Sequence, residues 1–144
     1  MASAPRLVSK PTRYLLDTNI CIYVAKGQPL AVRHRFEAHT LNELAMSIIT
    51  VGELRFGAEK SQARERALAT IAQLVQIIQP CALPMAAAEH YGHIRASLQR
   101  QGLPIGNNDL WLAAHAMAEG WTLVTNSTRE FSRIPGLRVE NWVE

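Results

Sequence analysis

The sequence contains little cysteine and no apolar run long enough to cross a membrane. Its two cysteines, Cys21 and Cys81, are too few for a disulfide framework and lack the spacing of a metal-binding motif. No segment approaches the roughly 20 apolar residues that span a bilayer. Residues 1–12 carry charges but no apolar stretch behind a basic start. We therefore expect a loose tail there, a folded domain over 13–144, no signal peptide and a cytoplasmic location.

Several common catalytic motifs are also absent. The sequence has no phosphate-binding G-x-x-x-x-G-K-[ST] loop, no dinucleotide-binding G-x-G-x-x-G and no G-x-S-x-G nucleophile elbow. A phosphatase of the haloacid dehalogenase type needs a second aspartate two residues after the first, and here Asn19 stands two residues after Asp17. These absences argue against four familiar classes of enzyme.

The chain has 144 residues, the length of one domain, and its 48% hydrophobic content suffices for a sizeable core. We find no repeat, low-complexity segment or internal linker that would divide it. The net charge is +3 and the sequence pI is about 9.2. This balance favours an anionic partner only weakly, because many basic proteins bind nothing acidic.

Short apolar segments alternate with amphipathic helical patterns along the chain. Strands are predicted at 14–16, 44–49, 122–126 and 136–142, with a further short one around Pro80. Helices are predicted at 18–27, 30–39, 50–60, 64–78, 85–102 and 108–120, with a helical turn at 127–134. This alternation predicts an α/β domain in which helices cover both faces of a central, mostly parallel β-sheet.

Three carboxylates stand where predicted strands give way to helices. Asp17 directly follows strand 14–16, Glu53 lies one helical turn past strand 44–49, and Asp109 opens a helix behind a Gly/Pro loop. In an open parallel sheet, the carboxyl ends of the strands form the ligand crevice. We therefore expect these three side chains to converge on one pocket.

Each acid also has an ordinary structural explanation. Acidic residues favour the first turn of a helix, where they meet the positive end of its dipole. Asp17 would serve as an N-cap, Glu53 would complete a capping box with Thr50, and Asp109 would be a simple helix-start acid. All three together are harder to explain in this way, because carboxylates that share a half-buried crevice repel one another. Such a group needs a cation or raised pKa values.

The cation expected at such a site is Mg²⁺ or Mn²⁺. Hard divalent ions bind carboxylate oxygens and keep several waters, and they activate water and stabilise charge on a phosphodiester. The five histidines show no zinc-binding pattern with the acids. His115 stands within the apolar run "LAAHAMA" and is expected to be a packing residue.

An ordered set of motifs extends from Tyr14 to Trp142. Its three segments are "YLLDTNICIYVAKG", "SIITVGELRFGAEKS" and "IGNNDLWLAAHAMAEGWTLVTNSTREFSRIPGLRVENW". Together they resemble the PIN-domain toxins of VapC type. The order of an aspartate, a G-E-L box, N-D before "AAHA" and a late "LVTN" with "EF" is far more specific than a lone D-T-N.

The resemblance implies a metal-dependent endoribonuclease, the toxin of a bacterial toxin–antitoxin pair. Its substrate would be structured RNA, a loop of tRNA or ribosomal RNA, so that cleavage inhibits translation. The resemblance also implies a homodimer, for which the apolar patterns at 18–26 and around Trp111 would supply the interface. A VapB-like antitoxin would neutralise the toxin through a groove lined by residues 18–60, and operator DNA would be contacted only through that antitoxin.

Compared residue by residue, Asp17, Glu53 and Asp109 match the acidic metal-binding positions of the family and would be both catalytic residues and metal ligands. Many PIN domains have a fourth acid after the late strand, and the matching region of this sequence has none. The number of metal ions therefore stays open. Asn126 or Ser127 would hold a metal-bound water or a phosphate instead.

Other residues near the acids would have supporting roles. Thr18 and Asn19 follow Asp17 and would hold it through hydrogen bonds. Arg55 or Arg129 would contact RNA phosphates if they lie near the cleft. Two alternatives to a toxin stay open: a non-toxic RNA-processing nuclease of PIN type, and a catalytically inactive RNA-binding module. The presence of all three acids argues against the inactive module.

Overall fold

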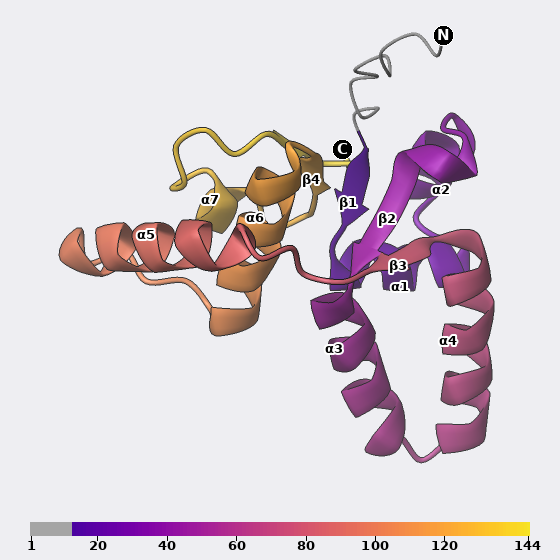
Figure 1. The fold of residues 1–144 in the computed structure, drawn as a ribbon. Coiled ribbons are helices and arrows are strands. Elements are labelled where there is room, and N and C mark those ends of the chain that lie inside the picture. Colours follow the sequence, from indigo (N-terminus) through magenta and orange to yellow (C-terminus); the bar gives the residue numbers. More distant parts are fainter. Residues whose placement is uncertain (1–12) are drawn as a thin grey trace, which may run out of the picture.

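The computed structural model describes residues 13–144, and the tail predicted at 1–12 lies outside the described residues (Figure 1). Five strands form one sheet: β1 (Tyr14–Leu16), β2 (Leu44–Ser47), β3 (Gln79–Cys81), β4 (Thr122–Val124) and β5 (Val139–Glu140). Their order is β3-β2-β1-β4-β5, and each neighbouring pair runs parallel. The predicted parallel sheet is confirmed.

Helices follow the strands in the alternation predicted from the sequence. They are α1 (Thr18–Lys26), α2 (Leu30–Glu37), α3 (Ile48–Glu59), α4 (Arg64–Ile77), α5 (Ala87–Arg100), α6 (Asn107–Glu119) and α7 (Thr128–Phe131), with a 3₁₀ turn at Leu41–Glu43. Helices α3 and α4 form a hairpin that projects below the sheet in Figure 1. None of the helices in residues 13–144 is long and apolar enough to cross a membrane.

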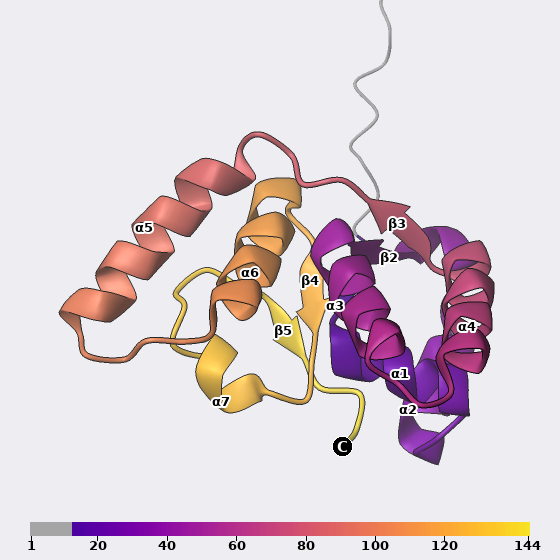
Figure 2. The same cartoon turned by 90° about the horizontal axis from the view of Figure 1, so that it is seen from below.

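The hydrophobic core lies on both faces of the sheet. Successive residues of a strand point to opposite faces, so Leu15 packs with the α5 and α6 side chains while Leu16 packs with those of α1, α2 and α4. Both leucines are fully buried. Figure 2 shows α5 and α6 on one side of the sheet and α1, α2 and α4 on the other. The predicted coverage of both faces is confirmed.

The boundary between β2 and α3 differs from the prediction. The strand predicted over 44–49 ends at Ser47, whose hydroxyl accepts a 3.1 Å hydrogen bond from the N–H of Ile49 and caps α3. Serine is a favoured N-cap, so the helix starts inside the apolar run that read as a strand. Thr50 is therefore buried within α3, and the predicted capping box between Thr50 and Glu53 is wrong.

The strand around Pro80 lies at the edge of the sheet. Pro80 pairs with Met46 of β2, and β3 has no neighbour on its other side within the described sheet. Proline lacks the N–H that a central strand needs, so an edge position is where it is tolerated. The central strands of the sheet are β1, β2 and β4. They lead into α1, α3 and α7, respectively.

Candidate functional site

Asp17 lies directly after β1, where its backbone N–H donates to the carbonyl of Val124 at the end of the adjacent strand β4. Its Oδ1 accepts a 2.9 Å hydrogen bond from the N–H of Ile20, so the predicted N-cap role is present. The side chain is only 6% exposed. Burial raises the pKa of Asp17, the negative charge of Glu53 adds to the rise, and a hydrogen bond from the Thr125 hydroxyl opposes it. Asp17 is thus both a cap and an acid held in an unfavourable environment for its charge.

Glu53 lies in the second turn of α3 and is half-buried. Its Oε1 accepts a 2.6 Å hydrogen bond from the hydroxyl of Thr18, which also lies 3.4 Å from the hydroxyl of Thr50. Its negative charge raises the pKa of both Asp17 and Asp109. Because the capping box is absent, the helix start does not account for Glu53, whose carboxylate is instead held by Thr18, the residue next to Asp17.

Asp109 is the third residue of α6 and is half-buried. Burial and the nearby negative charges of Glu53, Asp17 and Glu130, in that order, raise the pKa of Asp109 to about 6. The structure therefore brings the three predicted acids from α1, α3 and α6 into one electrostatically coupled cluster. A helix-start acid with only the dipole for a neighbour would have its pKa lowered, not raised.

A fourth carboxylate, Glu130, belongs to the same cluster and was not predicted from the sequence. It lies on α7 beside the fully buried Phe131, which anchors that helix to the core. Its charge contributes to the raised pKa of Asp109. Residues 125–127, which directly follow β4, contain no carboxylate. The short helix that follows is the signal that would have led to Glu130, because one helical turn returns the chain towards the sheet edge.

The predicted supporting residues occupy different positions around the acids. Thr18 bonds to Glu53 rather than to Asp17, and the backbone N–H of Asn19 hydrogen-bonds Asp17 while its side chain is exposed. Asn126 is exposed and accepts a 3.3 Å hydrogen bond from Asn141. Ser127 contributes its backbone N–H to the hydroxyl of Thr125.

Thr125, which directly follows β4, is the residue of this segment that faces the acids. It is fully buried and hydrogen-bonds Asp17. Its hydroxyl also accepts a 2.9 Å hydrogen bond from the N–H of Ser127. Thr125 therefore fixes the turn after β4 and the orientation of Asp17 together.

The cluster has the donor chemistry of a hard divalent cation site. Carboxylate oxygens are the ligands that Mg²⁺ and Mn²⁺ favour. A cation would also offset the repulsion among the four neighbouring carboxylates. In the conformation of residues 13–144, no three His, Cys, Asp or Glu side chains are gathered tightly enough to hold an ion on their own. An ion here would keep water ligands, as Mg²⁺ commonly does, or draw the side chains closer.

His115 is fully buried, as expected for a packing residue. Its Nδ1 lies 2.8 Å from the hydroxyl of Ser47, the residue that caps α3. Burial lowers the pKa of His115 to about 4, so the ring is neutral at physiological pH. Among the described residues its Nε2 has no hydrogen-bond partner. The contact ties α6, which carries Asp109, to the start of α3, which carries Glu53.

A groove of about 430 Å³ runs between α1, α3 and α4 and reaches the acids at one end. Thr18 and Glu53 line that end, and apolar residues line most of the rest, among them Ile22, Leu54, Ala67, Ile71 and Leu74. The predicted groove over 18–60 is thus present and has a second wall, α4, that lies beyond the predicted range.

Residues 14–137 match the PIN domain. Curated relatives include the tRNA(fMet)-specific endonuclease VapC of Shigella flexneri, 48% identical over 90% of this chain and 98% of the relative. Ribonuclease VapC2 of Haemophilus influenzae is 46% identical over 91% of this chain and 98% of the relative. The chain belongs to the PIN-domain family, among the VapC proteins.

Solved structures of VapC proteins have the same fold. The crystal structure of DNA-bound VapBC from Salmonella typhimurium matches with a TM-score of 0.85 and 43% sequence identity, over 92% of this chain and 99% of that chain. VapBC-1 from nontypeable Haemophilus influenzae matches with a TM-score of 0.85 and 38% identity, over 92% of this chain and 100% of that chain. Together with the sheet topology, these similarities confirm the predicted PIN-like α/β fold.

Proposed function

We propose that this chain is a metal-dependent endoribonuclease, the toxin of a VapBC toxin–antitoxin pair. The observation that carries the proposal is the convergence of Asp17, Glu53 and Asp109 at one sheet edge, with the pKa of both aspartates raised by burial and by neighbouring carboxylates. The names of the relatives, ribonuclease VapC2 and tRNA(fMet)-specific endonuclease VapC, support the same chemistry.

Asp17 and Asp109 would hold Mg²⁺ or Mn²⁺, and Glu130 would add charge on the side of Asp109. When bound, such an ion lowers the pKa of water and stabilises negative charge that develops on a phosphodiester. Thr125 and the N–H groups of Ile20 and Asn19 fix Asp17 for this role.

Glu53 would orient the attacking water, because the Thr18 hydroxyl fixes its Oε1 and leaves the other carboxylate oxygen to accept a hydrogen bond. The water loses a proton to solvent as its oxygen bonds to phosphorus, the bond from phosphorus to the 3′ oxygen breaks, and that oxygen takes up a proton from solvent.

The proposed substrate is structured RNA, a loop of tRNA or ribosomal RNA, whose cleavage would inhibit translation. The Shigella relative's name specifies tRNA(fMet), and the net charge of +3 is compatible with an anionic partner. Loops offer unpaired bases that a protein can stack and splay. A non-toxic RNA-processing nuclease would have the same acids; only the cellular substrate would separate the two.

The proposed protein partner is a VapB-like antitoxin, with operator DNA bound only through it. Support comes from relatives solved as VapBC complexes, two of them bound to DNA. The groove between α1, α3 and α4 has an apolar floor suited to a helix, and its acidic end is suited to an arginine.

A homodimer is also proposed, although much of α6 is used in the core and Trp111 stacks on Tyr91 with the ring centres 3.8 Å apart.

The test is cleavage by Asp109→Asn. Purified wild-type protein with Mg²⁺ should cleave total RNA at discrete sites, which sequencing of new 5′ ends would map, and Asp109→Asn should not. Glu89→Gln removes an exposed acid from α5 and serves as the matched control, with wild-type cleavage expected. Cleavage by Asp109→Asn at the wild-type rate would show that Asp109 only starts its helix.

A further inference from the structure

Phe56 is an exposed aromatic residue beside the acidic cluster. Its side chain is 66% exposed and it belongs to neither hydrophobic cluster of the core. It lies on α3, three residues after Glu53. A single exposed apolar side chain is ordinary on a protein surface, so a role for Phe56 has to come from what lies around it. The question is which ligand this ring would contact.

Helix geometry places Phe56 on the same stripe as Glu53. Residues separated by three and by seven positions share one face of a helix, so Glu53, Phe56 and Lys60 line one side of α3. Phe56 lies about 4.5 Å further along the helix axis than Glu53. This short step places the Phe56 ring next to the acids, where a base that adjoins the scissile phosphate would lie.

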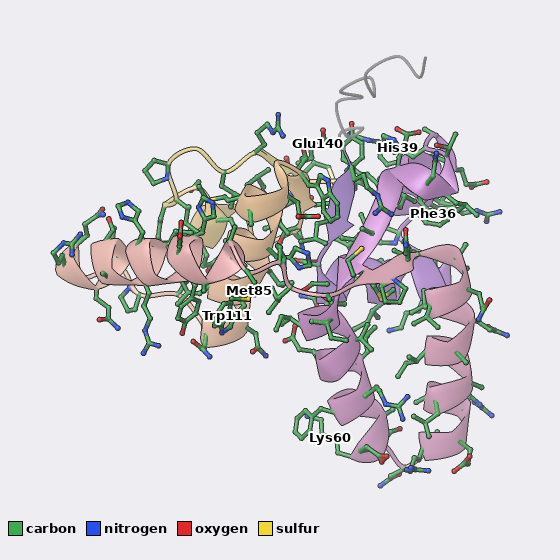
Figure 3. All side chains as sticks on the ribbon, viewed as in Figure 1. Phe36, His39, Lys60, Met85, Trp111 and Glu140 are labelled. Carbon is green, nitrogen blue, oxygen red and sulfur yellow. The ribbon has the colours of Figure 1, made fainter. Side chains whose placement is uncertain are left out.

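Phe56 and Lys60 do not line the proposed antitoxin groove. On α3 the groove is lined by Glu53, Leu54, Gly57 and Ala58. Figure 3 shows Lys60 projecting from the lower part of α3 on the side away from α4. Glu53 thus stands between two separate surfaces, the groove and the Phe56 stripe.

The charge on this stripe suits a phosphate backbone. The Nζ of Lys60 lies 4.8 Å from the centre of the Phe56 ring, and none of the ion pairs among residues 13–144 includes Lys60. The neighbouring acid, Glu59, is already paired with Arg64 at 2.7 Å. The Lys60 ammonium lies over one face of the ring, so a base would stack on the opposite face. Aromatic rings combined with positive charge are a common means of binding single-stranded nucleic acid.

We propose that Phe56 and Lys60 form an RNA-binding element next to the catalytic site: the Phe56 ring stacks on an unpaired base beside the scissile phosphate, and Lys60 binds the adjoining phosphate. This inference rests on the proposed ribonuclease function. It assigns the element to RNA, and a second protomer or the antitoxin are the competing occupants. The stripe selects unpaired RNA, because a base inside a duplex cannot stack on a protein ring.

Stacking can be separated from general apolar contact by the choice of substitution. Phe56→Leu keeps apolar area but removes the π face, whereas Phe56→Trp keeps the face and adds a fluorescent indole. Each is made in Asp109→Asn, which should bind RNA without cutting it. The probe is a fluorescein-labelled single-stranded polyadenylate oligonucleotide in Mg²⁺, with an RNA duplex for comparison. Met85→Ala, at a highly exposed residue near Trp111 and far from Lys60, is the control (Figure 3).

We expect Phe56→Leu to weaken binding of the single strand roughly ten-fold, as loss of one stacked base does. Phe56→Trp should keep the affinity, and the added indole's emission should be quenched by the RNA. Lys60→Gln should weaken binding and reduce the slope of log affinity against log salt by about 1. Met85→Ala should bind as the parent does, and duplex binding should not respond to Phe56→Leu.

Wild-type affinity in Phe56→Leu would overturn the proposal, and so would no binding of polyadenylate by the parent, since stacking depends little on sequence. If Phe56→Leu weakens self-association or antitoxin binding and leaves RNA binding unchanged, the stripe is a protein interface. Failure of the ribonuclease function itself is read separately, from wild-type protein that does not cleave total RNA in Mg²⁺.

Discussion

The hydroxyl of Thr18 donates a 2.6 Å hydrogen bond to Oε1 of Glu53. Thr18 is the first residue of α1 and follows Asp17 directly, so this bond connects the acid at the end of β1 to the acid on α3. A carboxylate on a long side chain has several rotamers, and the bond selects one of them. The orientation of the Glu53 carboxylate relative to Asp17 therefore depends on a single hydroxyl.

Thr18→Val should reduce cleavage while leaving the fold intact. Valine keeps the shape of threonine but cannot donate, so Glu53 loses its orientation. We expect a roughly 10-fold or greater fall in rate, as for other groups that orient a site, and a loss of about 1 kcal/mol in stability. Thr70→Val, which removes a hydroxyl bonded within α4, should leave cleavage unchanged. Equal rates for Thr18→Val and Thr70→Val would remove Thr18 from the mechanism.

Asp109→Asn should not destabilise the metal-free protein at neutral pH. The folded-state pKa of Asp109, about 6, lies above its ordinary value of 3.8, so the stability contribution of its neutral form is present below pH 3.8 and is lost as the pH rises through 6. Asparagine removes the repelled charge. After allowance for solvent screening, we expect a gain of about 1 kcal/mol at pH 7.5, which disappears at pH 3.5.

The response to Mg²⁺ gives a second comparison between the wild-type protein and Asp109→Asn. Mg²⁺ should raise the melting temperature of the wild-type protein, because a ligand of the folded state stabilises it, and should do so far less for Asp109→Asn. Thermal unfolding with and without Mg²⁺ measures both effects. An equal response of the two proteins to Mg²⁺ would place the ion elsewhere.

Glu130→Gln should weaken metal binding without abolishing it. Glu130 contributes to the raised pKa of Asp109 after Glu53 and Asp17, so its charge has the weakest effect of the three on that carboxylate. We expect Mn²⁺ affinity by calorimetry, and the Mg²⁺ concentration for half-maximal cleavage, to change roughly ten-fold. Glu119→Gln, at the opposite end of α6, is the control. Unchanged Mn²⁺ affinity in Glu130→Gln would leave three acids as the site.

The fold could be predicted from sequence because its elements follow local rules. Alternation of apolar strands with amphipathic helices, and the left-handed glycines Gly27 and Gly120 at the ends of α1 and α6, mark most boundaries. The prediction failed at Ser47, where a β-branched run continues from strand into helix. Only the hydrogen bond from the Ile49 N–H to the Ser47 hydroxyl distinguishes the two readings.

The three acids could be placed at one edge from the sheet rule alone, but their partners could not. Glu130 reaches the cluster through the turn of α7, and Thr125 rather than Asn126 faces Asp17. Both facts depend on side-chain direction over a few residues, which composition does not reveal. The second wall of the groove, α4, is likewise distant in sequence from α1.

His115 should make the protein sensitive to acid. Its pKa is about 4 in the folded protein and 6.5 ordinarily, so the unfolded chain binds more protons between these values and stability falls as the pH drops from 6.5 to 4. His115→Gln should lose less stability over this range than the wild type, although the lost contact with Ser47 should cost about 1–3 kcal/mol at pH 7.5. His93→Gln, on the exposed face of α5, should behave as the wild type. Denaturant unfolding at pH 6.5 and at pH 4 measures the free energy of unfolding of each protein. An identical loss of stability between these two pH values for all three proteins would contradict the prediction.

Gly57→Leu should separate cleavage from inhibition by the antitoxin. Gly57 lines the groove from within α3, and a Cβ at this position would meet no atom within 4 Å. A leucine side chain would therefore enter the groove without disturbing the fold, and replacing glycine inside a helix should stabilise the free protein by about 0.5 kcal/mol. Cleavage should be retained, because the acids keep their places.

Inhibition by a cognate VapB should instead weaken, because the leucine occupies space that the antitoxin segment needs. Gly92→Leu is the matched control: Gly92 also lies within a helix, α5, a Cβ there also meets no atom within 4 Å, and it is not part of the groove. Both variants should gain similar stability in denaturant unfolding. Titration of RNA cleavage with VapB should then require more antitoxin for Gly57→Leu alone. If both variants are inhibited as the wild type is, the antitoxin does not use this groove.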